Sequence, residues 1–504
     1  MTRARKRALA VPSPYAVLAL VIVIAALATW LLPAGRYDML RYDEARARLV
    51  VESPEGERVL PATQATLDSL GVRIALAKFE AGAIRRPVAI PGTYRREDKS
   101  AQGFLAVLRA PIRGLYEAID VVLFVLVIGG FIEVFSRSGA FEVGIGILAR
   151  RFAGREMWLI VILTSLFAAG GTIYGMAEET IAFYPLLVPI FLAAGFDVIV
   201  PLAVIFVGAG VGFMASTVNP FATIIASDAA GVGWTVGITG RLLMLALGLV
   251  VCIAYITRYA RRVKADPTTS LVPGMVDVTK VPAAASRPGN DHAPMTWRVR
   301  LLLAVFALTF AVMIFGVSRL GWWFEEMTTL FLGSAILVGI VRGGGEKAFM
   351  DAFVKGAASL LGVALIIGIA RGVTVVLNDG QISGTLLYHS SQAVQGMPRT
   401  AFVLALMLVF GGLSLFISSS SGMAVLTMPI MGSLATVVGV PSEQIVNAYL
   451  YGFGIMQLLA PTGMILPSLA MVDVPYSTWI RFVTPLMAML AVLAAIFLAA
   501  GVMA

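Results

Sequence analysis

The sequence predicts an all-α integral membrane protein with inverted repeats, two re-entrant hairpins and two interrupted helices. Of the 504 residues, 59% are hydrophobic and 13% are charged, whereas a water-soluble domain carries about 25% charged residues. Apolar runs of about 20 residues, enough to cross a bilayer as a helix, recur along the chain. Features of the first half also return in the second. The short alternating strands of a membrane barrel are missing from the sequence, so we expect helical spans.

The composition also argues against several classes of function. The net charge of +9 would suggest nucleic acid in a soluble protein, but here the basic residues lie mainly in loops between apolar runs. The single cysteine, Cys252, argues against a disulfide framework or a cysteine-based zinc cluster, and without a Walker motif we expect neither direct ATP use nor an ATPase subunit. His292 and His389 have no metal-ligating companions. We therefore expect no enzyme and no cofactor, apart from Na⁺ or H⁺ as a coupling ion.

The N-terminal region predicts a cytoplasmic tail, a first span and a small extracytoplasmic domain. Basic residues precede an apolar run from Tyr15 to Leu32, which is too long for the hydrophobic region of a typical signal peptide, the alternative interpretation. Residues 36–110 are polar and rich in both charge signs.

Beyond residue 110, apolar runs and polar breaks divide the chain into two comparable halves. Two regions hold paired apolar arms around a glycine-rich turn, and the arm from Met157 to Gly170 would span only about 21 Å of a ~30 Å hydrocarbon core. Re-entrant hairpins suit such arms better than two short tilted spans, which are the alternative. The expected order is tail and first span 1–35, extracytoplasmic domain 36–110, first repeat 111–258 (hairpin 156–196, broken helix 199–230), cytoplasmic linker 259–300, scaffold helices 301–345 and second repeat 346–504 (hairpin 400–438, broken helix 443–472).

Positive charges in the short loops predict the topology. The loops assigned to the cytoplasm hold 19 Lys and Arg residues, whereas those assigned outside hold only Arg319 and Arg399. This asymmetry follows the positive-inside rule. It places the N-terminus in the cytoplasm and the C-terminus in the periplasm of a bacterial inner membrane.

The repeat is visible across the linker. Gly170-Gly171 returns as Gly411-Gly412 after 241 residues, and each hairpin is followed by a span broken near its middle, at Asn219-Pro220 or at Pro461-Thr462-Gly463. The loop after 118–136 is rich in arginine, whereas its counterpart after 357–377 has one positive residue, which indicates that the halves enter the membrane from opposite faces. Paired interrupted helices in inverted repeats indicate a transport site near the bilayer midplane.

The first hairpin turn carries adjacent carboxylates, Glu178 and Glu179, which we expect to bind the substrate together with Thr172, Tyr174 and Asn219. Ionised carboxylates at membrane depth require a cation, a proton or a buried partner. The alternative is that they pair with arginine or cap the second arm. Because adjacent helical positions lie about 100° apart, we expect one carboxylate to face the ligand and the other to hold the hairpin.

The first broken helix offers Ser216, Thr217 and Asn219 directly before a proline. Hydroxyl, amide and freed carbonyl oxygens are ligands that suit Na⁺, so we expect an ion site here together with Gly175 and Glu178. A packing seam of small residues is the alternative.

The second hairpin turn supplies four hydroxyls, and its partner break supplies Thr462 and Gly463. Serines between apolar arms are poor lipid-facing residues and good ligands for a polar substrate. We expect Thr462 to contact the substrate as well, and Ser420, Gly422, Thr462 and Gly463 to contact the ion. The turn residues are Ser418, Ser419, Ser420, Ser421 and Gly422.

Lone charges give weaker signals. Glu133 and Arg371 occupy roughly equivalent places in the paired spans, which suggests a structural salt bridge between them. Alternatively, Arg371 contacts a substrate carboxylate.

Two motifs, Gly175-Met176-Ala177-Glu178-Glu179-Thr180 and Ser216-Thr217-Val218-Asn219-Pro220-Phe221, together resemble the YfcC-like carriers. These carriers belong with the anaerobic C4-dicarboxylate carriers and the arginine–ornithine antiporters. The resemblance implies a homodimer that moves substrate by an elevator mechanism, often coupled to sodium. The spans 15–32, 236–258, 301–320 and 327–342 would then form the scaffold and the dimer interface.

Together these features predict a secondary active transporter in the lipid bilayer that moves a small organic ion, coupled to an ion gradient or to exchange. The acidic first turn favours a basic or zwitterionic amino acid. A C4-dicarboxylate or another carboxylate is the alternative substrate, and an ion channel is the alternative of another class.

Overall fold

The computed structural model describes residues 13–503 except 81, 83, 85–86, 141–142, 145–154 and 273–294. The basic tail and most of the expected linker therefore lie outside the described residues. Within the described part, nine helices are long and apolar enough to cross a membrane. The first of them, α1 (Pro14–Leu31), begins with Ser13 accepting a hydrogen bond from the amide of Ala16 and with proline at its first position.

The second half of the chain repeats the element order of the first half. Each half has a short polar helix, a long apolar helix, a hairpin, a broken helix and a final helix of 28 residues. In the first half these are α4 (Phe104–Glu117), α5 (Ile119–Ser136), α7 (Met157–Tyr174), α8 (Tyr184–Ala193), α9 (Ile199–Met214), α10 (Ile225–Ala229) and α11 (Ile238–Ala265). In the second half they are α15 (Gly345–Ser359), α16 (Leu361–Asp379), α18 (Arg399–Ser414), α19 (Ser420–Val438), α20 (Ser442–Gln457), α21 (Ile465–Val472) and α22 (Tyr476–Met503).

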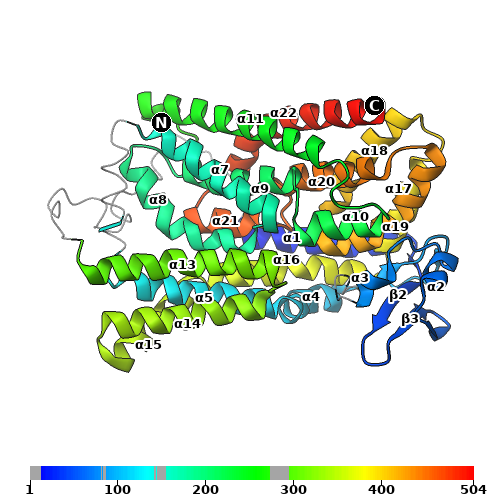
Figure 1. The fold of residues 1–504 in the computed structure, drawn as a ribbon, viewed down its shortest axis with the longest axis horizontal. Coiled ribbons are helices and arrows are strands. Elements are labelled where there is room, and N and C mark those ends of the chain that lie inside the picture. The colour runs from blue at the N-terminus through cyan, green and yellow to red at the C-terminus, as the bar shows by residue number, and fades with distance from the viewer. Residues whose placement is uncertain are drawn as a thin grey trace, which may run out of the picture.

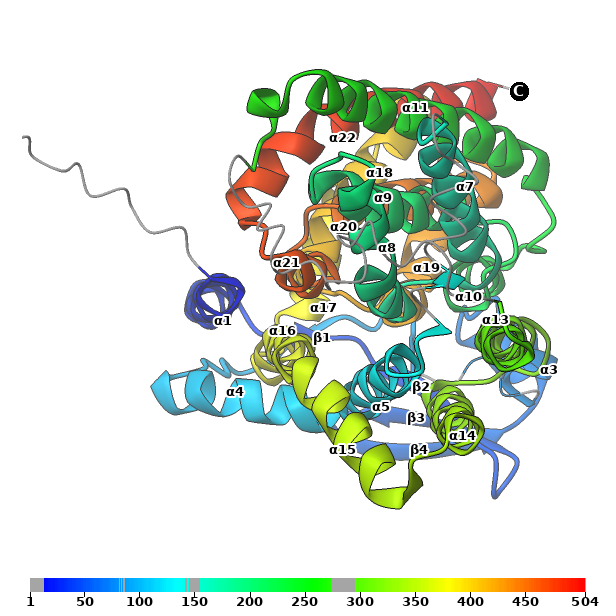
Figure 2. The same cartoon turned by 90° about the vertical axis from the view of Figure 1, so that its left-hand side faces the viewer.

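Seen along their length, the helices form two groups (Figure 2). One, the hairpin group, contains α7–α11 and α18–α22, with α11 and α22 at its outer edge. The other, the framework group, contains α1, α4, α5, α15 and α16 together with α13 (Trp297–Arg319) and α14 (Phe324–Arg342). A further helix, α17 (Ser383–Ala393), connects α16 to α18.

The expectation that 236–258 belongs with the scaffold spans is wrong. This span, α11, packs along α9 and α22 on the edge of the hairpin group farthest from α14. Gly248 of α11 lies against Val211 of α9, and the Tyr255 hydroxyl donates to the carbonyl of Phe482 at 2.6 Å. These contacts join α11 to the first broken helix and to α22, the final helix of the second half.

The two hairpins open at opposite ends of α11 (Figure 1). Glu156, just before α7, pairs with Lys264 near the C-terminal end of α11 at 3.2 Å. Glu443, which follows α19, lies against Gly237 at the N-terminal end of α11. The first hairpin therefore enters the helix bundle from one face and the second from the opposite face.

The short helices α4 and α15 cross the first long helix of the opposite half. Gly114 of α4 meets the backbone of Gly368 and Gly372 in α16, and Gly356 of α15 meets Gly129 in α5 so closely that a methyl group at either position would clash. Close backbone approach through small residues is a common way to pack helices in lipid.

Ion pairs accompany both crossings. Arg113 of α4 binds Asp379 at the end of α16, and Lys355 of α15 binds Glu133 near the end of α5 at 3.1 Å. Each half thus contacts the other through a helix crossing at glycine and an ion pair.

A small inserted domain, residues 35–103, separates α1 from α4. Its sheet has the strand order β4-β3-β2-β5, in which Val51 lies opposite Leu40 and both are buried. Tyr94 stacks on Tyr388 of α17 with ring centroids 4.1 Å apart. The elements are β1 (Gly35–Arg36), β2 (Met39–Asp43), β3 (Arg48–Ser53), β4 (Gly56–Pro61), α2 (Gln64–Ser69), α3 (Leu76–Glu80), β5 (Val88–Ala89) and β6 (Arg95–Arg96).

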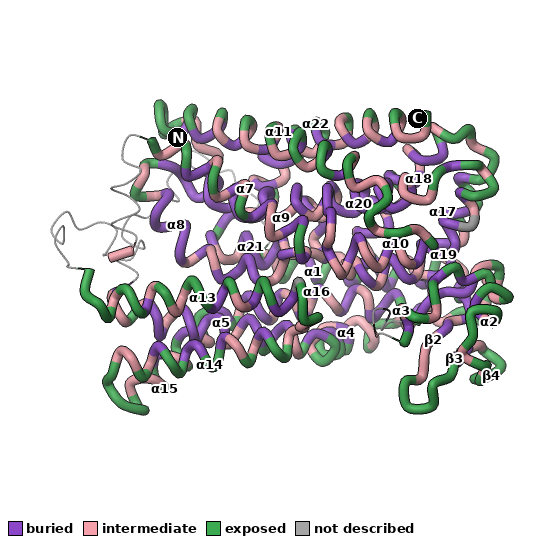
Figure 3. The backbone as a smooth tube through the Cα atoms, viewed as in Figure 1, coloured by how far each residue is buried: buried purple, intermediate pink, exposed green. Residues whose placement is uncertain are grey.

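Burial follows the arrangement expected for a protein solvated by lipid. The interior helices α9 and α20 are almost wholly buried, whereas the outward sides of α11, α13 and α22 are exposed (Figure 3). The exposed positions include large apolar residues such as Leu243, Val250 and Ile496. An apolar exterior around a buried pair of broken helices places any polar site in the interior.

Candidate functional site

The first hairpin tip is shaped by a glycine. The α7 helix ends at Tyr174, and Gly175 follows in the left-handed conformation with φ +79°. A Cβ at this position would lie 2.5 Å from Nδ2 of Asn219. Only glycine satisfies both the backbone angle and the close approach.

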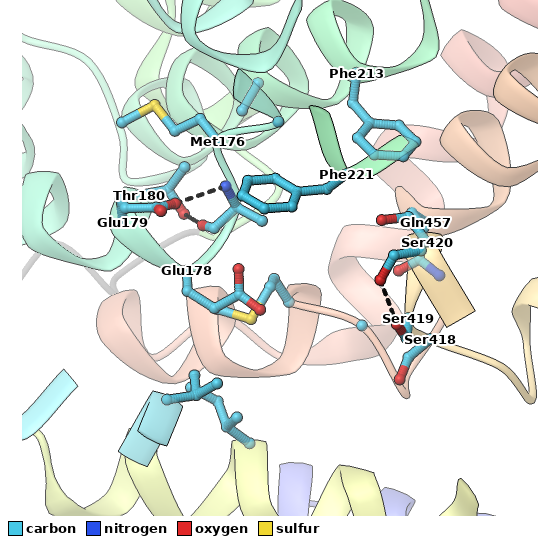
Figure 4. A pocket seen from close by; sticks show the side chains of 18 of the residues that line it. Met176, Glu178, Glu179, Thr180, Phe213, Phe221, Ser418, Ser419, Ser420 and Gln457 are labelled. Carbon is cyan, nitrogen blue, oxygen red and sulfur yellow. Dashed lines mark hydrogen bonds between the residues drawn. The ribbon is translucent and has the colours of Figure 1, made fainter. Parts of the chain in front are cut away.

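The tip carboxylates occupy different environments. Glu179 is 6% exposed, and its Oε2 accepts a hydrogen bond from the amide of Ala177 at 3.0 Å, within the same turn. Glu178 is half-buried and extends into a cavity (Figure 4). Glu178 is thus the carboxylate that extends into the cavity, whereas Glu179 is bonded within its own turn.

The polar residues of the first break bind one another. Thr217 and Thr172 exchange a hydroxyl contact of 3.1 Å, which joins the break to the first hairpin arm. Ser216 bonds Thr223 at 2.5 Å, and Oδ1 of Asn219 accepts from the amide of Phe221 at 2.8 Å. The Asn219 bond satisfies a backbone amide that would otherwise lack a partner where the helix restarts.

The second hairpin and its break are joined in the same way. Thr462 donates to the carbonyl of Leu415 at 3.0 Å, and Tyr449 donates to the carbonyl of Ser420 at 2.8 Å. Ser419 caps α19 by accepting from the amide of Gly422 at 3.1 Å. The side chains of Ser418 and Ser420 have no hydrogen-bond partner among the described residues and line the cavity.

A cavity of about 290 Å³ lies between the two hairpin tips and the framework group. Figure 4 shows Glu178 on one side, the serines and Gln457 on the other, and Phe221 between them. A cavity of this size suits a small organic molecule.

Four carboxylates and one guanidinium line this cavity. The carboxylates are Glu117, Asp120, Glu178 and Glu179, and the guanidinium is that of Arg371. The excess of negative charge favours a ligand that carries positive charge. Aromatic side chains, whose ring faces attract cations, complete the wall: Phe213, Phe221, Trp323, Phe324 and Phe453.

The structure divides the predicted site residues into two sets. Those lining the cavity are Gly175, Glu178, Glu179, Ser418, Ser419, Ser420, Ser421, Thr462 and Gly463. Those outside its lining are Thr172, Tyr174, Ser216, Thr217, Asn219 and Gly422. All of the second set except Tyr174 take part in the bonds described above, and Tyr174 is buried at the end of α7.

The suggested salt bridge between Glu133 and Arg371 is wrong. Glu133 pairs instead with Lys355 at 3.1 Å and Arg137 at 3.0 Å, near the end of α5. Arg371, near the middle of α16, instead lines the cavity between the hairpin tips. The α15 crossing, which was not visible in the sequence, supplies the partner that Glu133 needs.

Sequence reasoning missed the acidic residues contributed by the framework group. Glu117 ends α4 and Asp120 begins α5, directly beside the helix crossing. Trp323, which precedes α14, packs edge to face on Phe221 at 4.7 Å. No repeat motif marked these positions, although acidic residues at the start of an apolar span are an unusual feature.

The sequence pattern of the C4-dicarboxylate anaerobic carriers (DcuC) matches residues 11–503. The chain belongs to this family. It is therefore a multi-pass membrane transporter, and the expectation of a carrier family member rather than an enzyme is confirmed.

Two relatives match over nearly their whole length. An uncharacterized protein of Haemophilus influenzae Rd is 40% identical over 98% of this chain and 97% of its own. YfcC of Escherichia coli K12, provisionally named a basic amino acid antiporter, is 26% identical over 97% of this chain and 95% of its own. This second match confirms the YfcC-like resemblance.

Among solved structures, the YdaH transporter of Alcanivorax borkumensis aligns with 97% of this chain and 98% of its own. The two share 16% identity with a TM-score of 0.39.

Proposed function

We propose that this transporter moves a basic or zwitterionic amino acid across the bacterial inner membrane, coupled to exchange or to an ion gradient. The observation that carries the proposal is the excess of carboxylates around the cavity between the two hairpin tips. A cationic group would offset the cost of holding these charges at membrane depth. The name given to YfcC supports the same class of substrate.

The mechanism we propose is an elevator, in which the hairpin group carries the site past the framework group. The repeated element order, the hairpins entering from opposite ends of α11 and the reciprocal crossings of α4 and α15 support inverted repeats. The cavity is lined from both groups, so relative movement would open it to one face or the other.

The charge asymmetry of the loops supports a cytoplasmic N-terminus and a periplasmic C-terminus, which would make the inserted domain extracytoplasmic. We also propose a homodimer. Exposed apolar residues on α13 and α14, including Leu308, Phe315 and Ile336, support an interface on the framework group.

The coupling ion we propose is Na⁺ or H⁺. Ser216, Thr217 and Asn219 form a compact cluster of side-chain oxygens beside Gly175, which supports a sodium site next to the cavity. Glu178 is the cavity-lining group that supports a proton-coupled alternative.

A C4-dicarboxylate is the second candidate substrate, because the family is described by such carriers. Arg371 and the serine hydroxyls are suitable donors for carboxylates. Against it, a doubly negative ligand would face four carboxylates with one arginine in the same cavity.

The proposal is tested by a flux screen with the purified protein in liposomes. Radiolabelled lysine, arginine, ornithine, neutral amino acids and succinate are offered with and without a sodium gradient. We expect saturable uptake of at least one basic amino acid. Uptake of succinate alone would establish the second candidate instead.

A further inference from the structure

Arg371 is the one lysine or arginine that lines the cavity in the described part of the chain. Within the described part of the chain, its guanidinium forms no ion pair or hydrogen bond with another residue. An arginine in the interior of a membrane protein requires an anionic or carbonyl partner. Its position on α16 therefore leaves a charge that a ligand could neutralise.

Glu178, from the hairpin group, and Asp120, from the framework group, line the same cavity as this arginine. Arg371 and Glu178 are separated, since they form no ion pair with each other in the described part of the chain. The separation leaves room for a ligand that carries both charges.

We propose that Arg371 binds the carboxylate of the substrate while Glu178 and Asp120 face its cationic group. This inference rests on the proposed function and names the residue that binds the carboxylate of the amino acid. Amines that lack a carboxylate would leave Arg371 unpaired and should bind less tightly. An arginine can form two parallel hydrogen bonds with a carboxylate, which gives both strength and orientation.

The geometry also assigns the two ends of the substrate to different parts of the protein. Arg371 belongs to the framework group through α16, which packs against α4 and α1. Glu178 belongs to the hairpin group. A bound amino acid would therefore bridge the two groups, and Arg371 acts as a specificity residue.

The test compares lysine with lysinamide and cadaverine as competitors of labelled lysine uptake. Lysinamide replaces the carboxylate by a neutral amide, and cadaverine removes it. For the wild-type protein we expect both analogues to compete at least about tenfold less well than lysine, because a charge-assisted hydrogen bond is lost.

In Arg371→Gln we expect the KM for lysine to rise at least about tenfold while competition by cadaverine stays unchanged, so the discrimination disappears. Arg371→Lys should restore part of it. Arg319→Gln, at the exposed end of α13, is the matched control and should keep full discrimination. Thermal unfolding of each variant establishes that it is folded.

Equal competition by lysine and cadaverine in the wild type would overturn the role of Arg371 while leaving the proposed function intact. A uniform loss for all competitors in folded Arg371→Gln would also overturn it. If no amino acid binds but succinate binds in an Arg371-dependent way, the proposed function fails and the carboxylate role of Arg371 stands.

Discussion

At the residue scale, Glu178 and Glu179 are adjacent carboxylates with different surroundings. Glu178 lines the cavity, and Glu179 accepts a hydrogen bond from its own turn. The sequence predicted two distinct roles from the helical spacing alone. It could not assign the two roles to the two residues. The α-helix ends at Tyr174 and a 3₁₀ turn begins at Glu178, and this change of backbone sets where each side chain points.

Replacing Glu178 by glutamine removes the charge and keeps the shape. We expect lysine uptake to fall at least about tenfold, because an ion pair with the substrate cation becomes a neutral contact. Thermal unfolding should change little. Glu325→Gln, exposed in the first turn of α14, is the control; wild-type uptake by Glu178→Gln would remove this carboxylate from the site.

Replacing Glu179 should instead affect the stability of the tip. In Glu179→Ala the partly buried amide of Ala177 loses its acceptor, which costs at most about 1–3 kcal/mol. Glu179→Gln keeps an acceptor oxygen and should be the milder change. Hydrogen exchange at the Ala177 amide measures this directly, and equal protection in both variants would contradict the assignment.

At the element scale, the helices that were hardest to predict are α4 and α15. The long apolar spans were apparent from composition, but these two helices are short and polar enough to resemble loops. Their role depends on tertiary contacts: Gly114 and Gly356 allow each to cross a long helix of the other half. For the same reason the true partner of Glu133, Lys355, was not predicted.

The crossings can be tested by enlarging one glycine. Gly356→Leu forces a side chain against the backbone of Gly129, and we expect unfolding to become easier by about 1–3 kcal/mol or more. Gly333→Leu is the matched control, since nothing lies within 4 Å of a Cβ built there in α14. An equal effect of both variants would show that the crossing is not tightly packed.

At the scale of the whole molecule, the inserted domain touches both helix groups. Ser100 bonds the carbonyl of Asp379 at 2.7 Å on the framework side, while Lys78 pairs with Asp228 of α10 at 3.2 Å on the hairpin side. The sequence predicted this domain as a separate polar segment. Its contacts with α10 join residues about 150 apart in the chain, and no local pattern reports such a pairing.

If the hairpin group moves, the contact of Lys78 with Asp228 must break during transport. In a background with Cys252 replaced by alanine, Lys78→Cys and Asp228→Cys joined by a short thiol-reactive cross-linker should block lysine uptake. The single-cysteine variants treated with the same reagent are the controls. Full uptake by the cross-linked protein would contradict movement between these elements.

The central claim is that the protein is a carrier for basic amino acids, and counterflow tests it most directly. Liposomes containing the purified protein are loaded with unlabelled lysine, diluted into a trace of labelled lysine and sampled without ATP or an imposed membrane potential. The account predicts that labelled lysine transiently accumulates above its external concentration and that this overshoot vanishes in Glu178→Gln. Labelled lysine that only equilibrates through a conducting pore, or that does not enter at all, would contradict the account.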